Sequence, residues 1–345
     1  METYLAPPWL PGGNLQTIWP ALYARRTERP LPAYRRERWD TPDGDFIDVD
    51  FVDPQQAPTL AGERPLLVLF HGLEGSSRSH YAEAFAALAA ARGWAFAVPH
   101  FRGCSGELNR APRAYHSGDY EEVGWILARL KALHSGPERR AGGQGRREAP
   151  SVGAPILVAG VSLGGNALMR WAEEAGDSAA RTVRAVASIS APLDLAASGA
   201  AIGRGFNRLV YTRMFLSSMK PKALAKLAQH PGLFDRDALI AARDLYSFDN
   251  VFTAPLHGFK NTDDYWKRGS AKPQLHAIRV PALVVNAKND PFVPAASLPR
   301  PGEVGAHVTL WQPAHGGHVG FPPGRPPGHV RGMPEAVGAW LAQHT

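Results

Sequence analysis

Short apolar runs that alternate with helix-forming segments constrain the fold of this chain more than any other feature. Four runs read as buried strands, at residues 65–70, 94–99, 155–160 and 183–189. Strand and helix alternate four times here with short connections, which is typical of a parallel sheet that helices cover on both faces. After residue 277 the alternation resumes with runs at 281–286 and 306–311. The sequence therefore predicts an α/β fold, a doubly wound and mostly parallel sheet.

The N-terminal part reads differently. Residues 1–38 are rich in proline, aromatic residues and arginine, and they show little apolar periodicity. We expect an arm that packs on the rest of the chain and does not fold independently. Its expected contacts are Trp9, Leu10, Leu15, Ile18 and Trp19. Residues 34–51 predict an antiparallel hairpin at the edge of the sheet, because Asp43-Gly44 lies between two extended runs.

Two further segments interrupt the alternation. Residues 195–277 read as several helices without strands, around 199–217, 221–229 and 235–244, which predicts a helical cap inserted over the sheet. The Arg- and Gly-rich stretch 134–150 is typical of a surface insertion. With 345 residues, 44% of them hydrophobic, the chain is long enough for a sizeable core. We expect a single domain, 1–345, that carries the arm and the cap.

A serine flanked by glycines follows the strand at 155–160. In Gly160-Val161-Ser162-Leu163-Gly164 the chain passes from this strand into a helix. A sharp turn at that point would expose the Ser162 hydroxyl at the carboxyl edge of the sheet, where ligands of such sheets bind. Because the motif is short, Ser162 is a candidate nucleophile only if other strand ends supply partners for it.

The candidate acid is Asp290, which follows the strand at 281–286. Its rival is Asp194, which follows the strand at 183–189 next to the insertion. The order Ser, Asp, His along the chain is the order that this architecture uses for its catalytic residues. We therefore favour Asp290.

Two histidines follow the strand at 306–311, and His318 is the favoured base over His315. Gly316 and Gly317 precede His318, so a flexible turn could present its ring to Ser162. The chemistry needs this combination. A serine hydroxyl is a weak nucleophile, an imidazole must take its proton, and a carboxylate must orient the imidazole and stabilise its charged form.

A tetrahedral intermediate also needs hydrogen-bond donors for its oxyanion. The backbone amides of Leu163, just after Ser162, and of Leu73, after the strand at 65–70, are the candidates. We interpret His71 as a structural hydrogen-bonding residue beside this loop. Cys104 has no identifiable acid–base partner and is interpreted as a structural thiol.

Composition excludes several classes of function. The chain has one cysteine, so it forms no intrachain disulfide and no cysteine-based metal site. The other histidines lack metal-ligand spacing, and we expect no metal and no cofactor. The formal charge of +7 accompanies 31 acidic residues and scattered arginines, which argues against nucleic acid as a partner. No signal peptide or bilayer-spanning stretch is apparent, so we expect a soluble, cytoplasmic protein, with peripheral membrane contact left open.

Several strings together resemble those of a known family. They are PPWLPGGNLQTIWP at 7–20, HGLEGSSRSHY at 71–81, HFRGCSGE at 100–107, GVSLGGNAL at 160–168, SAPLDL at 190–195 and GGHVGF at 316–321. With them the chain resembles the α/β-hydrolase superfamily, and more narrowly the YheT-like, or AB hydrolase 4, family of carboxylesterases and lipases. The resemblance implies a serine-hydrolase fold with a helical cap and a triad of Ser162, Asp290 and His318. It also favours substrates with acyl chains.

The expected function is that of a serine esterase that forms an acyl-enzyme on Ser162. An amidase or acyltransferase with the same triad, and a non-catalytic binding protein, are the alternatives. Four residues of the insertion are candidates for contact with an acyl group: Phe206, Tyr211, Met214 and Phe215. The same residues could simply pack the insertion onto the sheet. The basic segment 204–226 is expected to be an ordinary solvated face, with contact to anionic membranes as the alternative.

Overall fold

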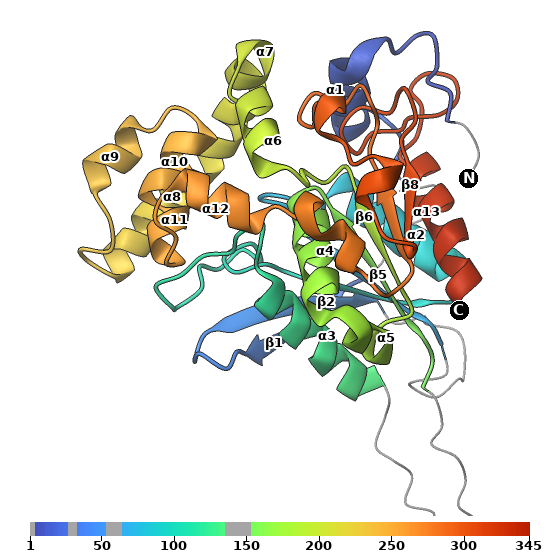
Figure 1. The fold of residues 1–345 in the computed structure, drawn as a ribbon, viewed down its shortest axis with the longest axis horizontal. Coiled ribbons are helices and arrows are strands. Elements are labelled where there is room, and N and C mark those ends of the chain that lie inside the picture. Colours follow the sequence, from blue (N-terminus) through green and yellow to red (C-terminus); the bar gives the residue numbers. More distant parts are fainter. Residues whose placement is uncertain (1–3, 27–32, 53–63, 135–152) are drawn as a thin grey trace, which may run out of the picture.

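A computed structural model describes residues 4–26, 33–52, 64–134 and 153–345 of the chain. Its centre is an eight-stranded sheet in the order β1-β2-β4-β3-β5-β6-β7-β8 (Figure 1). The strands are β1(Arg35–Asp40), β2(Phe46–Val52), β3(Leu66–Phe70), β4(Ala95–Pro99), β5(Ile156–Val161), β6(Ala185–Ile189), β7(Ala282–Val285) and β8(Val308–Trp311). From β4 to β8 every neighbouring pair is parallel, while β1 and β2 pair antiparallel at the edge. The predicted mostly parallel sheet is confirmed.

Helices cover both faces of this sheet. The α-helices of the described residues are α1(Gly12–Leu22), α2(His80–Ala91), α3(Tyr120–His134), α4(Leu163–Ala175), α5(Ala179–Thr182), α6(Leu195–Ile202), α7(Gly205–Asn207), α8(Arg213–Gln229), α9(Arg236–Ala241), α10(Leu245–Val251), α11(Thr253–Leu256), α12(Thr262–Gly269) and α13(Gly332–Leu341), of which α2 to α5 and α13 pack on the sheet. One core lies between the sheet and α3, α4 and α5, and a second lies between its other face and α2 and α13 (Figure 1). Because both faces are covered, β3 and β5 are buried at every position.

The segment between β6 and β7 contains helices joined by short loops and no strand, and we call residues 195–277 the helical insertion. Its first helices differ from the expected helix at 199–217. Here α6 ends at Ile202, and Gly205, with φ 50°, starts a new helix. That helix runs through α7, one π-helical turn η2(Arg208–Thr212) and α8, and it ends at Gln229. Glycines at 203 and 205 break the helix where the apolar pattern alone continues across them.

The N-terminal arm contains a helix that its composition did not predict. In α1 the side chain of Leu15 is 46% exposed, whereas Gln16 is only 1% exposed. The expectation that Leu15 packs inward was therefore wrong. Leu10 is buried as expected, and the ring of Trp9 lies edge-on to that of Trp19 at 5.5 Å.

Two further expectations from the sequence concern the surface insertion and membrane-spanning segments. Residues 135–152, which include all but the first residue of the expected surface insertion at 134–150, lie outside the described residues. Among the helices described, none has the length and hydropathy to cross a bilayer.

Candidate active site

Ser162 occupies the turn between β5 and α4 in a backbone conformation that is rare for a residue with a side chain. Its φ is 52° and its ψ is −119°, and its amide donates to the carbonyl of Ile189 at 2.8 Å. Such strain costs about 1–3 kcal/mol and persists only where the surroundings enforce it. The flanking glycines make the turn possible, because a Cβ on Gly160 would lie 2.5 Å from the carbonyl oxygen of Gly164. The local sequence thus forces the Ser162 side chain out of the strand.

His318 lies between Ser162 and Asp290. Its Nε2 is 3.0 Å from Ser162 Oγ, and its Nδ1 is 2.8 Å from Asp290 Oδ2. With the proton on Nδ1, the ring donates to the carboxylate and leaves the Nε2 lone pair for the serine hydroxyl proton. The three side chains come from the ends of β5, β7 and β8, and the fold brings them together as the sequence predicts.

The carboxylate of Asp290 is fixed on both of its oxygens. While Oδ2 faces His318, Oδ1 accepts hydrogen bonds from the amides of Phe292 at 2.8 Å and Val293 at 3.3 Å. Its side chain is fully buried. The ring of Phe292 also lies 4.2 Å from the imidazole of His318, centroid to centroid. Asp290 and His318 are therefore held in one orientation without any ligand.

The rival acid and base lie elsewhere. Asp194 caps α6, and its Oδ1 accepts from the amide of Ala197 at 3.0 Å. His315 approaches the side chain of Asn289, with 3.4 Å between Nδ1 and Nδ2. Neither residue has a hydrogen bond to Ser162 or His318 in the described part of the chain.

His71 and Cys104 are buried without a reactive environment. His71 Nε2 accepts from the amide of Phe101 at 3.0 Å, and Nδ1 contacts the carbonyl of Gly72 at 2.8 Å. Burial lowers the pKa of His71 to about 3, so the ring stays neutral. Burial also raises the pKa of the Cys104 thiol to about 12. Both observations agree with structural roles. Across the described ranges, His, Cys, Asp and Glu form no cluster of three that could hold a metal ion.

The two candidate oxyanion donors lie at adjacent strand ends. Because β3 and β5 pair in parallel with Phe70 opposite Gly160, the residues after both strands meet at one edge of the sheet. A Cβ on Gly72 would lie 3.2 Å from the Cβ of Ser162. Leu73 and Leu163 both line the same cavity as Ser162. Neither amide donates to an acceptor among the described residues, so both are free for a ligand oxygen.

A cavity of about 160 Å³ opens beside Ser162 and His318. Its lining is mostly apolar and comes largely from the helical insertion, including Ile202, Phe215, Met219, Leu245, Phe248 and Phe252. Of the four residues expected to contact an acyl group, only Phe215 lines this cavity. Tyr211 is buried against Phe292, with 4.5 Å between ring centroids.

Phe206 and Met214 lie on the outside of the insertion, 51% and 53% exposed, which departs from the expectation. Helical periodicity is the reason. Residues 206, 210 and 214 share one side of the helix, whereas 211, 215 and 219 share the side that faces the molecule.

Asp249 is a buried carboxyl group in the cavity wall. It accepts from Thr253 Oγ1 at 2.6 Å and from Trp266 Nε1 at 2.9 Å, and burial raises its pKa from 3.8 to about 6. Because the folded pKa lies above the unfolded value, the folded protein binds more protons between these values. This group's contribution to stability is therefore present at low pH and is lost as the pH rises toward 6.

Asp249→Asn is expected to remove that pH dependence. The free energy of unfolding of the variant, minus that of the wild type, should increase by about 2 kcal/mol between about pH 4 and pH 7. Urea unfolding at both pH values measures it, and the subtraction cancels the contributions of all other titrating groups. A difference that stays constant or shrinks with rising pH would contradict this account.

Three residues at the site were missed by the sequence reasoning: Gln16, Thr17 and Asn289. Gln16 Oε1 accepts from Asn289 Nδ2 and from the amide of Gly316, each at 2.9 Å. Thr17 Oγ1 accepts from the amide of His318 at 2.8 Å, and Asn289 Oδ1 accepts from the amide of Gly317 at 3.0 Å. Helix α1 is thus hydrogen-bonded to the loops that carry both Asp290 and His318. The only sequence signal was a polar Gln-Thr pair among apolar and glycine residues in the string at 7–20.

Comparisons with known proteins bear on the family and the fold of the chain. Residues 67–328 match the model named "Alpha/beta hydrolase family". "Putative esterase YheT" of Escherichia coli is 38% identical over 89% of this chain and 84% of its own length. "Phospholipase ABHD3" of Mus musculus is 28% identical over 93% of this chain and 73% of its own. The structure of Est1E from Butyrivibrio proteoclasticus with bound ferulic acid shares the fold, with a TM-score of 0.54 at 14% identity over 90% of this chain and 98% of that one.

Proposed function

Because the chain belongs to the YheT-like branch of the alpha/beta hydrolase family, we propose that it hydrolyses carboxylic esters through an acyl-enzyme on Ser162. One observation carries the proposal. A serine in a strained turn lies 3.0 Å from an imidazole whose other nitrogen lies 2.8 Å from a buried carboxylate, and the serine opens on an apolar cavity.

The reaction has two balanced halves. Ser162 Oγ attacks the ester carbonyl as its proton passes to His318 Nε2, and the amides of Leu73 and Leu163 stabilise the oxyanion. Collapse breaks the bond to the alcohol, which leaves with the proton from His318. Water then attacks the acyl-enzyme, gives a proton to the same nitrogen, and releases the carboxylic acid when that proton returns to Ser162. Asp290 keeps the ring in place and stabilises its charged form throughout.

The substrate class is inferred from the cavity lining. Phe215, Phe248 and Phe252 offer apolar contact to an acyl chain but few polar partners for a hydrophilic one. Relatives whose names include phospholipase and monoacylglycerol lipase favour lipid-like esters. The helical insertion then acts as a cap over the acyl chain. A cytoplasmic location stays a prediction.

A panel of p-nitrophenyl esters of increasing acyl length, with the matching p-nitroanilides, tests the proposal. We expect ester hydrolysis, with kcat/KM rising by up to about fourfold per methylene until the chain fills the cavity. A fluorophosphonate should label the wild-type protein. Absence of both labelling and ester hydrolysis would refute an activated serine, and faster hydrolysis of the anilides would make the protein an amidase.

A further inference from the structure

The outer side of the helix formed by α7, η2 and α8 carries exposed apolar side chains. Phe206, Leu209, Val210 and Met214 are 51%, 64%, 37% and 53% exposed. They recur at spacings of three and four residues, so they share one side of the helix. Arginines lie among them, also exposed. We call the following set the cap patch: Arg204, Phe206, Arg208, Leu209, Val210, Arg213 and Met214.

Charge on this part of the chain has a single sign. No aspartate or glutamate occurs between residues 195 and 234. The lysines there have partners, since Lys220 donates to the carbonyl of Ile240, Lys222 pairs with Glu74, and Lys226 donates to the carbonyl of Ala111. The three arginines of the cap patch have no acidic partner in the ranges that the structure describes. Their charge therefore faces solvent uncompensated.

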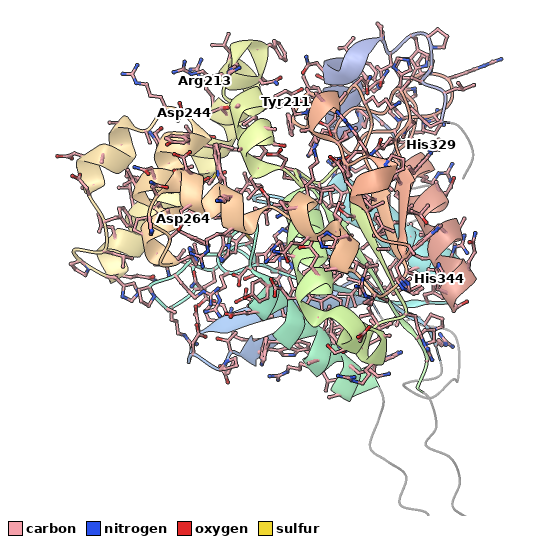
Figure 2. All side chains as sticks on the ribbon, viewed as in Figure 1. Tyr211, Arg213, Asp244, Asp264, His329 and His344 are labelled. Carbon is pink, nitrogen blue, oxygen red and sulfur yellow. The ribbon has the colours of Figure 1, made fainter. Side chains whose placement is uncertain are left out.

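The same helix contacts the site with its other side. Tyr211 packs on Phe292, which in turn packs on His318, and the hydroxyl of Tyr211 donates to Asn14 Oδ1 of α1 at 2.9 Å. Figure 2 shows Tyr211 on the side of this helix toward α1, with Arg213 pointing away from it. The helix is apolar on two sides, although only the inner one is covered.

We propose that the cap patch docks the protein on anionic lipid membranes. Apolar side chains flanked by arginines are the composition of helices that lie in the membrane interface, and unpaired guanidinium groups complement negatively charged headgroups. Docking would hold at the membrane the helix that also carries Phe215 and Met219 of the cavity wall. Binding needs no catalysis, so it holds or fails independently of the proposed reaction.

Flotation with vesicles tests this proposal. We expect the full chain to bind vesicles made of equal parts of phosphatidylcholine and phosphatidylglycerol, and to bind less as salt increases. The double variant R208Q/R213Q should bind about thirtyfold more weakly, as expected for the loss of two arginines near a charged surface. L209S/M214S should also bind more weakly. The matched control R236Q/R243Q removes the same charge from exposed positions of the helical insertion outside the patch and should bind like the wild type.

Three outcomes would overturn docking on lipid. The wild type could fail to bind anionic vesicles, R208Q/R213Q could bind as tightly as the wild type, or R236Q/R243Q could lose as much binding. Sedimentation velocity adds a fourth. If the wild type self-associates and L209S/M214S is monomeric, the patch is an interface between copies of the chain. Hydrolysis of a short soluble ester should be equal in all of these proteins, which reports intact folding.

A separate observation carries a second inference, which rests on the proposed function. Helix α1 is joined by Thr17 and Gln16 to the loops that carry His318 and Asp290, and Gln16 is 1% exposed. The fit is close, because a Cβ on Gly13 would overlap the carbonyl oxygen of Asn289. We infer that Thr17 is a positioning residue that fixes the height of His318 above Ser162, with Gln16 fixing the two loops relative to each other.

Thr17→Val and Thr17→Ser separate positioning from bulk stability. Valine keeps the shape but leaves the amide of His318 without an acceptor, whereas serine keeps the hydroxyl. We expect T17V to lower kcat about ten- to a hundredfold with KM unchanged, and T17S to retain the wild-type rate. Urea midpoints show whether T17V is folded at the assay temperature. Equal kcat in folded T17V and T17S would overturn the inference, whereas an inactive wild type would instead refute the proposed function.

Discussion

Ser162→Ala is expected to lower kcat for ester hydrolysis by about 10⁶-fold, the magnitude found when the nucleophile of another serine hydrolase is removed. The reason is geometric. The Ser162 hydroxyl is the only one that the described residues place within hydrogen-bond distance of His318 Nε2. Without it no acyl-enzyme forms, and fluorophosphonate labelling should disappear together with turnover.

A matched substitution controls for damage to the fold. Ser178→Ala removes a hydroxyl that donates to the carbonyl of Ala175, just beyond the far end of α4. It should leave kcat and labelling at wild-type values. The nucleophile assignment would be wrong if Ser162→Ala kept a tenth or more of the activity, or if labelling moved to another serine.

Asp290→Asn is expected to lower kcat by about 10⁴-fold, by analogy with the same change in a serine protease. The carboxylate accepts from His318 Nδ1, and an amide that turns its NH₂ group toward the ring would favour the wrong tautomer. The backbone amides of Phe292 and Val293 would still find an acceptor on the other side-chain atom, so the fold should survive. Steady-state kinetics together with a urea midpoint measure both points.

The rival acid and base provide the controls. Asp194→Asn alters only the cap of α6, and it should cost stability of about 1 kcal/mol or less without a change in kcat. His315→Ala should leave kcat within a few-fold of the wild type, because within the described ranges His315 has no hydrogen bond to Ser162 or Asp290. A larger loss of kcat in Asp194→Asn than in Asp290→Asn would reverse the assignment of the acid.

The sheet could be predicted because its central strands are continuous apolar runs, which indicate burial on both faces. β3 and β5 are apolar along their whole length, and all of their residues are buried between two helical layers. Ser162 and its partners could be placed for a related reason. In a parallel sheet the carboxyl ends of all strands lie at one edge. The position of the residues that follow each strand can therefore be predicted from the sequence.

What could not be predicted depends on contacts across long separations. Hydrophobicity alone favours Leu15 over Gln16 as the inward residue of the arm, yet Gln16 is buried because its side-chain oxygen accepts from the backbone amide of Gly316 and the side-chain amide of Asn289. Likewise the sequence alone does not separate the aromatic and aliphatic residues near 206–215 into those that face inward and those that face solvent. Only the helix start at Gly205 and the π-helical turn decide that Phe215 faces the cavity and Phe206 faces solvent.

The hydrogen bond between Gln16 and Gly316 spans 300 residues of sequence, and this sets the order in which the protein can mature. On the ribosome α1 emerges 300 residues before Gly316, and it must wait for that length of chain before this partner exists. Ser162 can occupy its turn much earlier, when β3, β5 and β6 have assembled. Ser162 would thus be positioned before His318 and Asp290 are locked, and the proposed activity would appear only after α1 has docked on the loops that carry these two residues.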